Sequence, residues 1–312
     1  MKNCLIIGGN GFIGKNLAAY LAGKGFLVTV VDHDIYGQNP LTPGVRYHVG
    51  SASDTVKLLE LAADADSVVW LVHSTVPATS MIDIESDLST NITPLIRLVN
   101  ALSQSRVSKK FLYLSSGGTI YGDVKPGVKI EEHFPKNPIS SYGLTKLIAE
   151  EYLNFLNRGS LLQMAIFRPS NVYGPHQNFS KPQGILGYAF RAMLENRPLP
   201  VYGNGSIVRD YVYVGDIARA IELFLLAPST GPAPLTVNIG SGIGHSIREV
   251  LDEIKNVSGR ALEIDWLPAR HYDCEYNVLS FARAEQALGW RPTVDLRAGL
   301  GLLWKWIRTA QA

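Results

Sequence analysis

The sequence of 312 residues is 46% hydrophobic and 18% charged, a composition that is ordinary for a globular protein and excludes an extended disordered chain. Its 29 basic and 27 acidic residues leave a formal net charge of +2, so we expect neither a nucleic-acid surface nor a polybasic membrane contact. No apolar run reaches the roughly 18 residues of a membrane span, and the N-terminus lacks the pattern of a signal peptide.

From the N-terminus to about residue 170, short apolar runs alternate with segments of helical periodicity. The predicted strands are 4–8, 26–32, 67–72, 110–116 and 162–169. The predicted helices are 12–23, 54–63, 86–105 and 141–157. Nearly continuous apolar strands that alternate with helices are typical of a parallel sheet covered on both faces. We therefore predict an α/β fold, a Rossmann-type doubly wound parallel sheet.

After about residue 170 the pattern changes to short strands, such as "PLPVYGNGS" and "LTVNIGSG", interleaved with helices. The helices predicted here are near 184–195, 215–226, 246–257, 281–287 and 296–309. The predicted division is 1–170 for the Rossmann domain and 171–312 for a smaller α/β lobe, with the chain free to cross between them more than once. A ligand is expected between the two, beyond the carboxyl ends of the strands.

The two cysteines, Cys4 and Cys274, lie at opposite ends of the chain and have no spacing typical of a metal site. We expect both to be reduced thiols, and we expect no bound metal. Together with the missing signal-peptide pattern, this predicts a soluble cytoplasmic protein.

The stretch "IIGGNGFIGKNLAAYLAGKG" places Gly8, Gly11 and Gly14 between the first strand and the first helix. The first allows a tight turn, the second lets the backbone approach a pyrophosphate, and the third permits close packing of helix on strand. Asp32 ends the next strand, where a carboxylate accepts hydrogen bonds from an adenosine ribose and repels a 2′-phosphate. The pattern predicts an NAD site, with a purely structural turn as the alternative. The neighbouring His33 is the feature that keeps NADP open.

The stretch "SSYGLTKLIAEEYL" carries Tyr142 and Lys146 four residues apart, so both lie on one face of a helix. A phenol ordinarily titrates near ~10. An adjacent ammonium, together with the positive nicotinamide of an oxidised cofactor, would lower the pKa of Tyr142. Tyr142 is therefore the candidate base that takes a proton from a substrate hydroxyl while hydride leaves the same carbon. The alternative is a surface helix in which this spacing occurs by chance.

These motifs together resemble the extended short-chain dehydrogenase/reductase family, in its group of NAD-dependent nucleotide-sugar epimerases and dehydratases. The resemblance rests on the glycine loop, Asp32, "LSSGGTIYG" and "YGLTK", and continues through "RPSNVYGP", "VRDYVYVGDIARA", "NIGSG", "ARHYD" and "LGWRP". The branch that it most resembles is that of the UDP-hexose 4-epimerases, which act on UDP-glucose or UDP-N-acetylglucosamine. It implies NAD as the cofactor, a nucleotide-diphosphate sugar as the substrate, and a homodimer formed by the helices 86–105 and 141–157.

The resemblance also implies which residues contact the two ligands. Those implied for NAD are Gly8, Gly11, Phe12, Ile13, Gly14, Asp32, Ser51, Leu71, Asn91, Tyr142, Lys146 and Pro169. Those implied for the nucleotide sugar are Ser74, Asn171, Pro200, Tyr202, Arg209, Arg270, Asp273 and Asn277. An arginine suits a diphosphate because its planar guanidinium can bond phosphate oxygens with two N–H groups. For the two arginines, the alternative is a salt bridge with Asp210 or Asp273.

Two further positions bear on the sugar. His73 and Ser74 match a segment beside the hexose, with packing as the alternative. Asn277 occupies the position that limits whether an N-acetyl group fits, and it is smaller than the tyrosine found there in some relatives. This favours tolerance of N-acetylated hexoses.

One catalytic position departs from the family pattern. The serine or threonine that shares the sugar O4 proton with the tyrosine corresponds to Gly117. If the segment stays extended, Gly117 and Thr119 point to one face, so Thr119 is predicted to supply the hydroxyl across the space left by Gly117, with Ser116 as the reserve. The alternative is that Thr119 caps local backbone. Related dehydratases and decarboxylases carry acidic residues in this stretch, and "GGT" supplies none, which argues against that chemistry.

The leading interpretation is a 4-epimerase with tightly held NAD that passes through a 4-keto sugar. The alternative is a reductase of a 4-keto-6-deoxy nucleotide sugar, which would use Tyr142 as an acid and which Asp32 disfavours by disfavouring NADPH. A third class is a catalytically silent regulator that senses a dinucleotide, against which the intact Tyr142 and Lys146 argue.

Overall fold

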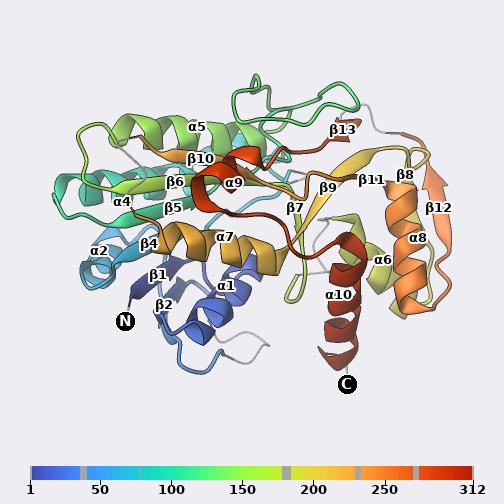
Figure 1. Ribbon diagram of the computed structural model, residues 1–312, viewed down its shortest axis with the longest axis horizontal. Coiled ribbons are helices and arrows are strands. Elements are labelled where there is room, and N and C mark those ends of the chain that lie inside the picture. The colour runs from blue at the N-terminus through green and yellow to red at the C-terminus, as the bar shows by residue number, and fades with distance from the viewer. Residues whose placement is uncertain are drawn as a thin grey trace.

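The computed structural model describes residues 2–35, 41–77, 79–177, 184–228, 233–269 and 274–310. Its main layer is a parallel sheet of seven strands in the order β10-β6-β5-β4-β1-β2-β3 (Figure 1). The strands are β1 (Asn3–Ile7), β2 (Leu27–Asp32), β3 (Arg46–Val49), β4 (Ser67–Trp70), β5 (Lys110–Leu114), β6 (Gln163–Pro169) and β10 (Leu235–Ile239). This is the predicted Rossmann-type sheet, and its order reverses between β1 and β4, where such folds bind their ligands.

Helices cover both faces of this sheet. One face packs on α1 (Phe12–Gly23), α7 (Val214–Leu226) and α9 (Ala282–Leu288), and the other on α2 (Thr55–Ala63), α4 (Thr93–Gln104) and α5 (Ser141–Leu156). The strands β1, β4, β5 and β6 are almost wholly buried because both of their faces contribute to a core. Two separate hydrophobic cores therefore hold the sheet, and its carboxyl edge is left for the site.

The structure differs from the sequence prediction in three elements. The predicted helix 86–105 is divided into α3 (Ile84–Asn91) and α4, because Pro94 lies in the first turn of α4 and cannot donate a backbone hydrogen bond. The strand β3 was not predicted, since its sequence is a half-exposed "RYHV" without an apolar run. The stretch "LTVNIGSG" was assigned to the C-terminal lobe, whereas β10 is the edge strand of the main sheet.

The C-terminal lobe is built on shorter sheets. The strands β7 (Asn171–Tyr173), β9 (Val208–Tyr213), β11 (Gly244–Ser246) and β13 (Tyr276–Asn277) form one sheet, and β8 (Leu199–Tyr202) pairs with β12 (Ile264–Leu267). Its helices are α6 (Ile185–Leu194), α8 (Ile247–Ser258) and α10 (Leu296–Ala310), which share a third core with β8 and β9. The division at residue 170 stays a prediction, and the chain does cross back after it, since α7 and β10 belong to the main layer.

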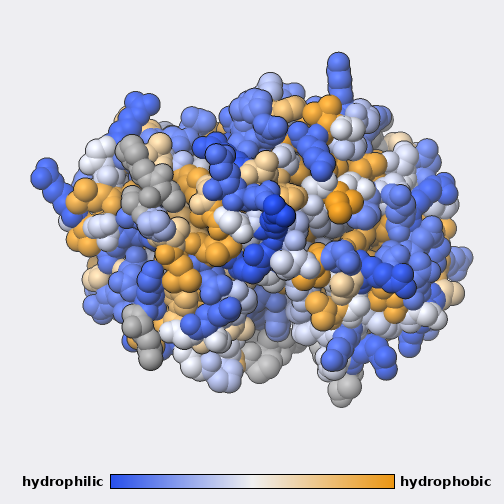
Figure 2. Space-filling view, viewed as in Figure 1, coloured by the Kyte–Doolittle hydropathy of each residue, from blue (hydrophilic) through white to orange (hydrophobic). Residues whose placement is uncertain are grey.

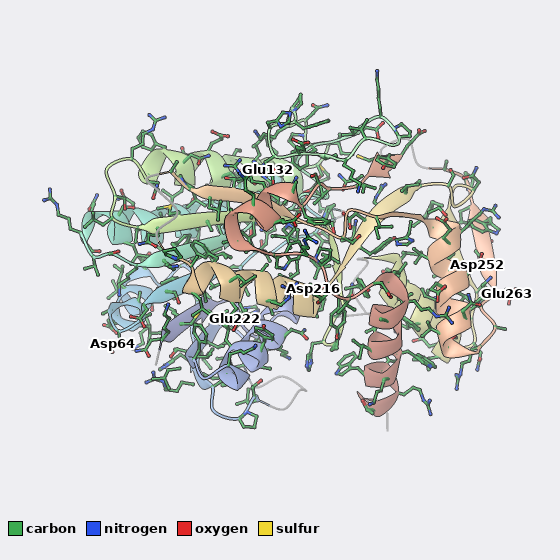
Figure 3. The ribbon with its side chains drawn as sticks, viewed as in Figure 1. Asp64, Glu132, Asp216, Glu222, Asp252 and Glu263 are labelled. Atoms are coloured by element: carbon green, nitrogen blue, oxygen red, sulfur yellow. The ribbon has the colours of Figure 1, made fainter. Side chains whose placement is uncertain are left out.

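A buried aspartate fastens the segment that leads into α10 to the main layer. Asp216 lies on α7, labelled in Figure 3, and is 1% exposed. Its carboxylate accepts hydrogen bonds from the backbone N–H of Thr293 at 2.9 Å and of Val294 at 3.0 Å. These bonds hold the segment 293–294 against α7.

The surface is mixed in character. Figure 2 shows hydrophilic side chains over the whole of the viewed face, interspersed with hydrophobic ones, as is ordinary for globular proteins. Each helix in the described ranges is too short or too polar to cross a bilayer. Cys4 is a buried free thiol, and burial raises its pKa to about 12.

Candidate active site

The loop between β1 and α1 has the geometry that a bound pyrophosphate requires. Gly8 has a φ of +82°, and a Cβ there would lie 2.9 Å from Cγ2 of Val72, so a side chain is excluded. A Cβ on Gly14 would lie 2.5 Å from Cα of Gly9, so α1 packs this closely on the loop only because Gly14 has none. Gly11 is exposed and precedes α1 without a side-chain cap. The first N–H groups of the helix therefore face outward and can bind an anion.

Asp32 ends β2 and is bound to the glycine loop. Its Oδ2 atom accepts a hydrogen bond from the Asn10 N–H at 2.9 Å, and its Oδ1 atom accepts one from the His33 N–H at 2.8 Å. The His33 imidazole Nδ1 lies 2.9 Å from the same Oδ1 atom. A carboxylate has about four acceptor sites, so one remains for a ribose hydroxyl. Ser51 lies in the turn after β3, exposed, and its hydroxyl accepts a hydrogen bond from the Ser53 N–H at 3.1 Å.

The other residues implied for the cofactor lie along the same edge of the sheet. Phe12 and Ile13 are the half-buried first residues of α1. Leu71 follows β4, and its N–H donates to the Ile7 carbonyl at 2.9 Å. Pro169 ends β6. The structure thus brings these residues together at the carboxyl ends of the parallel strands, where a dinucleotide site is expected.

Tyr142 and Lys146 lie on the first turns of α5, one turn apart. The helix begins after Ser140, whose hydroxyl accepts a hydrogen bond from the backbone of the first turn. The Lys146 Nζ atom is buried and donates to the Leu114 carbonyl at the end of β5, at 2.8 Å. It also lies 4.9 Å from the ring centroid of Tyr113 and 5.7 Å from that of Tyr142. The pair is therefore held against the carboxyl edge of the sheet.

Burial dominates the protonation of both groups. It raises the pKa of Tyr142 to about 12, against a hydrogen bond with Ser116 that lowers it, while the charge of Asp87 raises it further. Burial lowers the pKa of Lys146 to about 7, and the carboxylates of Glu150 and Asp87 act in the opposite direction. The expectation that Lys146 would lower the pKa of the tyrosine is therefore not met by the protein's own groups. Both side chains are desolvated, and desolvation penalises the charged form of each.

Gly117 has no space beside it. A Cβ at this position would lie 2.5 Å from Cδ1 of Leu279 and 2.9 Å from the Arg168 carbonyl oxygen. Its carbonyl accepts a hydrogen bond from the Asn277 side chain at 3.2 Å, and its N–H donates to the Pro169 carbonyl at 2.8 Å. The prediction that Gly117 leaves an empty space is therefore wrong, because the Leu279 side chain fills that space.

The two candidate hydroxyls differ in their surroundings. The strand β5 ends at Leu114 and the chain then turns, so the strand alternation predicted for Thr119 does not extend that far. Ser116 lies close enough to Tyr142 to lower its pKa through a hydrogen bond. The Thr119 hydroxyl is buried and has no hydrogen-bond partner among the residues that the structure describes. One hydroxyl is thus engaged with the tyrosine, and the other is left without a bond.

Asn91 and Ser74 bind each other. The Asn91 Oδ1 atom accepts hydrogen bonds from the Ser74 N–H at 2.8 Å and from its hydroxyl at 3.2 Å. The Asn91 amide N–H₂ donates to the backbone carbonyl and to the carboxylate of Asp87. The side chain of Asn91 is therefore satisfied within the protein, and it fixes the loop after β4.

On the nucleotide-sugar side, Arg209 has only neutral partners among the described residues. Its guanidinium donates to the backbone carbonyls of Val208, at 3.0 Å, and Cys274, at 2.5 Å. Asp210, the alternative salt-bridge partner, is instead fully buried and accepts hydrogen bonds from Ser241. The half-buried guanidinium of Arg209 therefore carries a positive charge that is available to an anion.

The remaining residues implied for the sugar are placed as follows. Asn171 donates to the Asp210 carbonyl at 2.9 Å. Pro200 and Tyr202 are exposed on β8, and Tyr202 is 38% exposed. The side chain of Asn277 is buried, and its Oδ1 atom has no partner in the part of the chain described. Arg270 and Asp273 lie outside the described residues.

Sequence analysis missed a buried network behind the pair. The Arg168 Nε atom lies 3.1 Å from both carboxylate oxygens of Glu150, and the guanidinium also donates to the Tyr121 hydroxyl at 2.8 Å. Ser115 donates to the same Glu150 carboxylate. The signal was present in the sequence, because Glu150 follows Lys146 by four residues and so shares its helix face.

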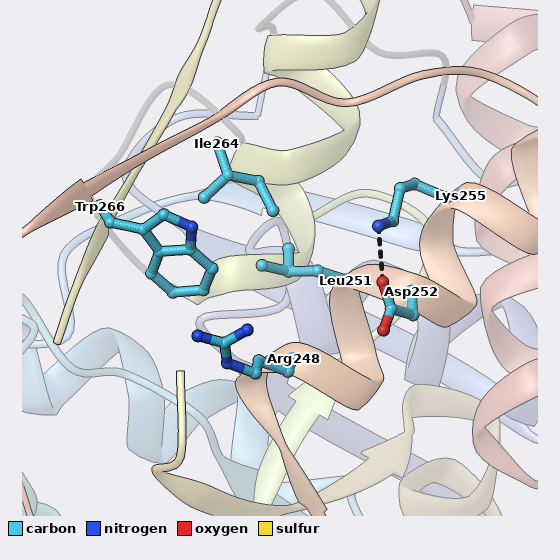
Figure 4. A pocket seen from close by; sticks show the side chains of 6 residues that line it. All are labelled: Arg248, Leu251, Asp252, Lys255, Ile264 and Trp266. Atoms are coloured by element: carbon cyan, nitrogen blue, oxygen red, sulfur yellow. Dashed lines mark ion pairs between the residues drawn. The ribbon is translucent and has the colours of Figure 1, made fainter. Parts of the chain in front are cut away.

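A separate hollow of about 240 Å³ lies on the C-terminal lobe (Figure 4). It is lined by Arg248, Leu251, Asp252, Lys255, Ile264 and Trp266. In it, the Arg248 guanidinium lies 4.8 Å from the Trp266 ring, and Lys255 pairs with Asp252 at 2.5 Å. No predicted site residue lines this hollow, so it is distinct from the site at the sheet edge.

The fold and the site together define a dinucleotide-binding Rossmann protein with a tyrosine–lysine pair at the same carboxyl edge of the sheet as its glycine loop. Comparison with known proteins gives the family. Residues 4–240 match the model of the NAD dependent epimerase/dehydratase family. The chain belongs to this family, whose cofactor is NAD, and the loop and Asp32 fit that dinucleotide.

Relatives cover almost the whole chain. The UDP-glucose 4-epimerase of Thermotoga maritima, solved with UDP-glucose, is 30% identical, covers 99% of this chain and 100% of its own, and has a TM-score of 0.91. The UDP-glucose 4-epimerase of Thermus thermophilus, solved with NAD, is 31% identical, with 99% of both chains covered and a TM-score of 0.88. A dTDP-4-dehydro-6-deoxyglucose reductase of Escherichia coli is 27% identical over 97% of both chains.

The packing around Gly117 yields a first prediction. Restoring the family residue with Gly117→Ser should lower the free energy of unfolding by about 2 kcal/mol, because the new side chain overpacks against Leu279. Urea unfolding followed by circular dichroism measures this change.

Gly118→Ser is the matched control. The nearest atom to a Cβ at Gly118 is the Ser116 hydroxyl at 3.9 Å, so we expect stability close to that of the unchanged protein. Leu279→Ala combined with Gly117→Ser should cost less than the sum of the two single changes, because the truncated leucine frees the space. Full stability and higher turnover in Gly117→Ser would contradict this account.

Proposed function

We propose that this protein is a 4-epimerase of a UDP-hexose, either the UDP-glucose/UDP-galactose or the UDP-N-acetylglucosamine/UDP-N-acetylgalactosamine pair. The observation that carries the proposal is the placement of Tyr142 and the buried Lys146 against the end of β5, at the same carboxyl edge of the sheet as the glycine loop. Two relatives of about the same length are UDP-glucose 4-epimerases. We also propose a cytoplasmic location, which the buried free thiol of Cys4 supports.

In the proposed mechanism, bound NAD⁺ supplies the acceptor for hydride from C4 of the sugar, and its positive charge favours the phenolate. Tyr142 takes the proton of the C4 hydroxyl and later returns it. Lys146 orients the tyrosine and reaches the nicotinamide ribose. The 4-keto sugar turns about its diphosphate before reduction on the opposite face, so the protein must hold the nucleotide firmly and the sugar loosely.

We propose that residues of the C-terminal lobe bind the nucleotide diphosphate. Arg209, with no carboxylate among its described partners, binds the diphosphate together with Arg270. Asn171 bonds the sugar diphosphate. Pro200 and Tyr202, exposed on β8, line the base pocket, and Asp273 binds the nucleotide ribose.

Asn277 is proposed to favour acceptance of an N-acetyl group. Its unbonded Oδ1 atom is buried, where an acceptor without a partner is costly. The N–H of an acetamido group is a donor of the kind that this atom lacks. Within the proposed function, this supports the N-acetylated pair as a substrate alongside the unmodified one.

The second candidate is the reductase of a 4-keto-6-deoxy nucleotide sugar. It is favoured by the similarity to the Escherichia coli dTDP-4-dehydro-6-deoxyglucose reductase. Asp32 argues against it to the extent that such an enzyme uses NADPH, because the carboxylate repels a 2′-phosphate. The two candidates differ in whether external reduced cofactor is consumed.

We expect the purified protein to convert UDP-glucose or UDP-N-acetylglucosamine to its 4-epimer without added cofactor, since NAD is regenerated in each cycle. Proton NMR of the anomeric signals measures the product. Tyr142→Phe, which keeps the ring and removes the base, should reduce turnover at least ~10²-fold. NAD should be released when the protein is denatured. Turnover of a 4-keto-6-deoxy sugar that requires NAD(P)H, with no epimer formed, would instead establish the second candidate.

The two hydroxyls near the tyrosine should give different phenotypes. Thr119→Val removes an unbonded buried hydroxyl, proposed to face the sugar, and should lower kcat about 10²-fold with little change in KM. Ser116→Ala removes a hydrogen bond that lowers the pKa of Tyr142, so the pH profile of kcat should move to higher pH. Steady-state kinetics across pH measures both effects.

Thr309→Val, an exposed change on α10, is the matched control and should match the unchanged protein. If Thr119→Val leaves kcat unchanged, Thr119 is not the hydroxyl that meets the sugar. An unshifted pH profile in Ser116→Ala would remove Ser116 from its proposed role.

We propose a homodimer formed through α3, α4 and α5, of which both α3 and α4 pack on α5. Apolar side chains on these helices are exposed, namely Ile84, Leu88, Leu144, Tyr152 and Phe155. Along α5 they recur at helical spacing and form one apolar stripe. Such a stripe is costly in water and is typical of an interface.

Light scattering after size-exclusion chromatography should therefore give the mass of two chains. Phe155→Glu, which puts a charge into the stripe at a side chain that is 61% exposed, should give the mass of one. Leu302→Glu, at an exposed leucine of α10, is the control that should leave the dimer intact. A single-chain mass for the unchanged protein would refute the dimer.

A further inference from the structure

A fully buried carboxylate, that of Asp87 on α3, lies behind the tyrosine–lysine pair. Its Oδ1 atom accepts hydrogen bonds from the Thr75 hydroxyl and, at 2.9 Å, from Asn91. Its Oδ2 atom accepts a hydrogen bond from the Ser141 hydroxyl at 2.6 Å, and the Thr145 hydroxyl, which donates to the Tyr142 carbonyl at 3.0 Å, lies 3.4 Å from the same atom. Three donors, with a fourth hydroxyl nearby, surround this acidic group, which suits an ionised carboxylate because that form only accepts.

These bonds join three segments that meet at the site. Thr75 belongs to the loop after β4, Asn91 ends α3, and Ser141 and Thr145 flank Tyr142 on the first turns of α5. The position of the tyrosine base therefore depends on Asp87 through its two neighbours in the helix. The loop and the helix cannot move apart without leaving a buried carboxylate short of donors.

Asp87 has no lysine or arginine within ion-pair distance among the described residues. The nearest basic group is the His73 imidazole, whose Nε2 atom lies 3.8 Å from Oδ1 and makes no hydrogen bond. The His73 ring meets the Tyr142 ring edge to face, with centroids 4.5 Å apart. Burial, with Lys146 adding to it, lowers the pKa of His73 to about 2, so this imidazole is neutral. The cation of the cluster is therefore Lys146.

Two other titratable side chains near the pair, Glu150 and Tyr113, add no unpaired charge. Glu150, one turn after Lys146 on α5, is paired with Arg168, which offsets its charge. Tyr113 on β5 is buried, and burial raises its pKa well above the ordinary value, so it is neutral. Asp87 is thus the unpaired negative charge among the described groups that face Tyr142 and Lys146.

We propose that Asp87 is a positioning residue for the tyrosine base, which places Tyr142 through Ser141 and Thr145 and whose charge favours the ammonium form of Lys146. This inference rests on the proposed function of the pair. The charge of Asp87 acts in the same direction on both groups, since it raises the pKa of Tyr142 and that of Lys146. Its removal should therefore lower both pKa values together.

Asp87→Asn tests the charge because it keeps the shape of the side chain. We expect both limbs of the pH profile of kcat to move to lower pH by about one unit, the size typical of a nearby charge. We also expect kcat at neutral pH to change more than KM. Asp87→Ser, a smaller neutral side chain, serves the same test if the asparagine variant does not fold. A lower rate at every pH with an unshifted profile would show a merely structural role and overturn the proposal.

Three further variants separate charge from hydrogen bonding. Glu85→Gln removes an exposed charge from the same helix, and its profile should not move. Asp87→Glu keeps the charge, so its profile should stay in place even where its rate is lower. Ser141→Ala removes one bond and leaves the charge, so it should lower kcat without a shift. A shifted profile in Asp87→Glu would refute the assignment.

A second readout does not depend on turnover. The ionisation of Tyr142 in the protein with NAD bound can be followed as phenolate ultraviolet absorbance, taken as the difference between the unchanged protein and Tyr142→Phe. In the Asp87→Asn background this titration should occur at lower pH than with Asp87 present. An unchanged titration would overturn the proposal. If the unchanged protein epimerises no nucleotide sugar, the proposed function fails, and the titration still decides the role of Asp87.

Discussion

The arrangement of the site depends on one buried cation, the ammonium of Lys146. An ammonium removed from water is costly unless acceptors replace the water, and here these are the Leu114 carbonyl and the faces of two tyrosine rings. To supply them, α5 must lie against the end of β5 in one register. That register places Tyr142 one turn before Lys146 and Glu150 one turn after it. The base, the cation and the supporting carboxylate are therefore positioned together.

Burial disfavours the charged form of both groups in this cluster. It raises the pKa of Tyr142 to about 12 and lowers that of Lys146 to about 7, so both groups are largely uncharged at moderately alkaline pH. Glu150 and Asp87 oppose this for the lysine, and the Ser116 hydrogen bond opposes it for the tyrosine. Groups tuned in this way by burial and specific partners are characteristic of sites that transfer protons.

Side chains of the C-terminal lobe contact the turn that follows β5, at Gly117. Asn277 on β13 donates to the carbonyl of Gly117, and Leu279 fills the space beside that glycine. The turn that carries Ser116 and Thr119 is thus packed against the lobe in which Arg209 offers its charge. These contacts join the lobe that is proposed to bind the diphosphate to the turn that carries the two hydroxyls.

The sequence by itself determined the elements and much of the site, because these follow from short-range spacing. Apolar runs and helical periodicity predicted most strands and helices, and the glycine spacing and the interval from Tyr142 to Lys146 each placed residues on one turn or one helix face. Tertiary structure alone decided what depends on contacts between distant segments. It put β10 at the edge of the main sheet, filled the place beside Gly117 with Leu279, and turned the chain after Leu114 so that Ser116 meets the tyrosine. It also buried Asp87 and desolvated Tyr142, because burial depends on what the rest of the chain packs around a residue and not on its neighbours in sequence.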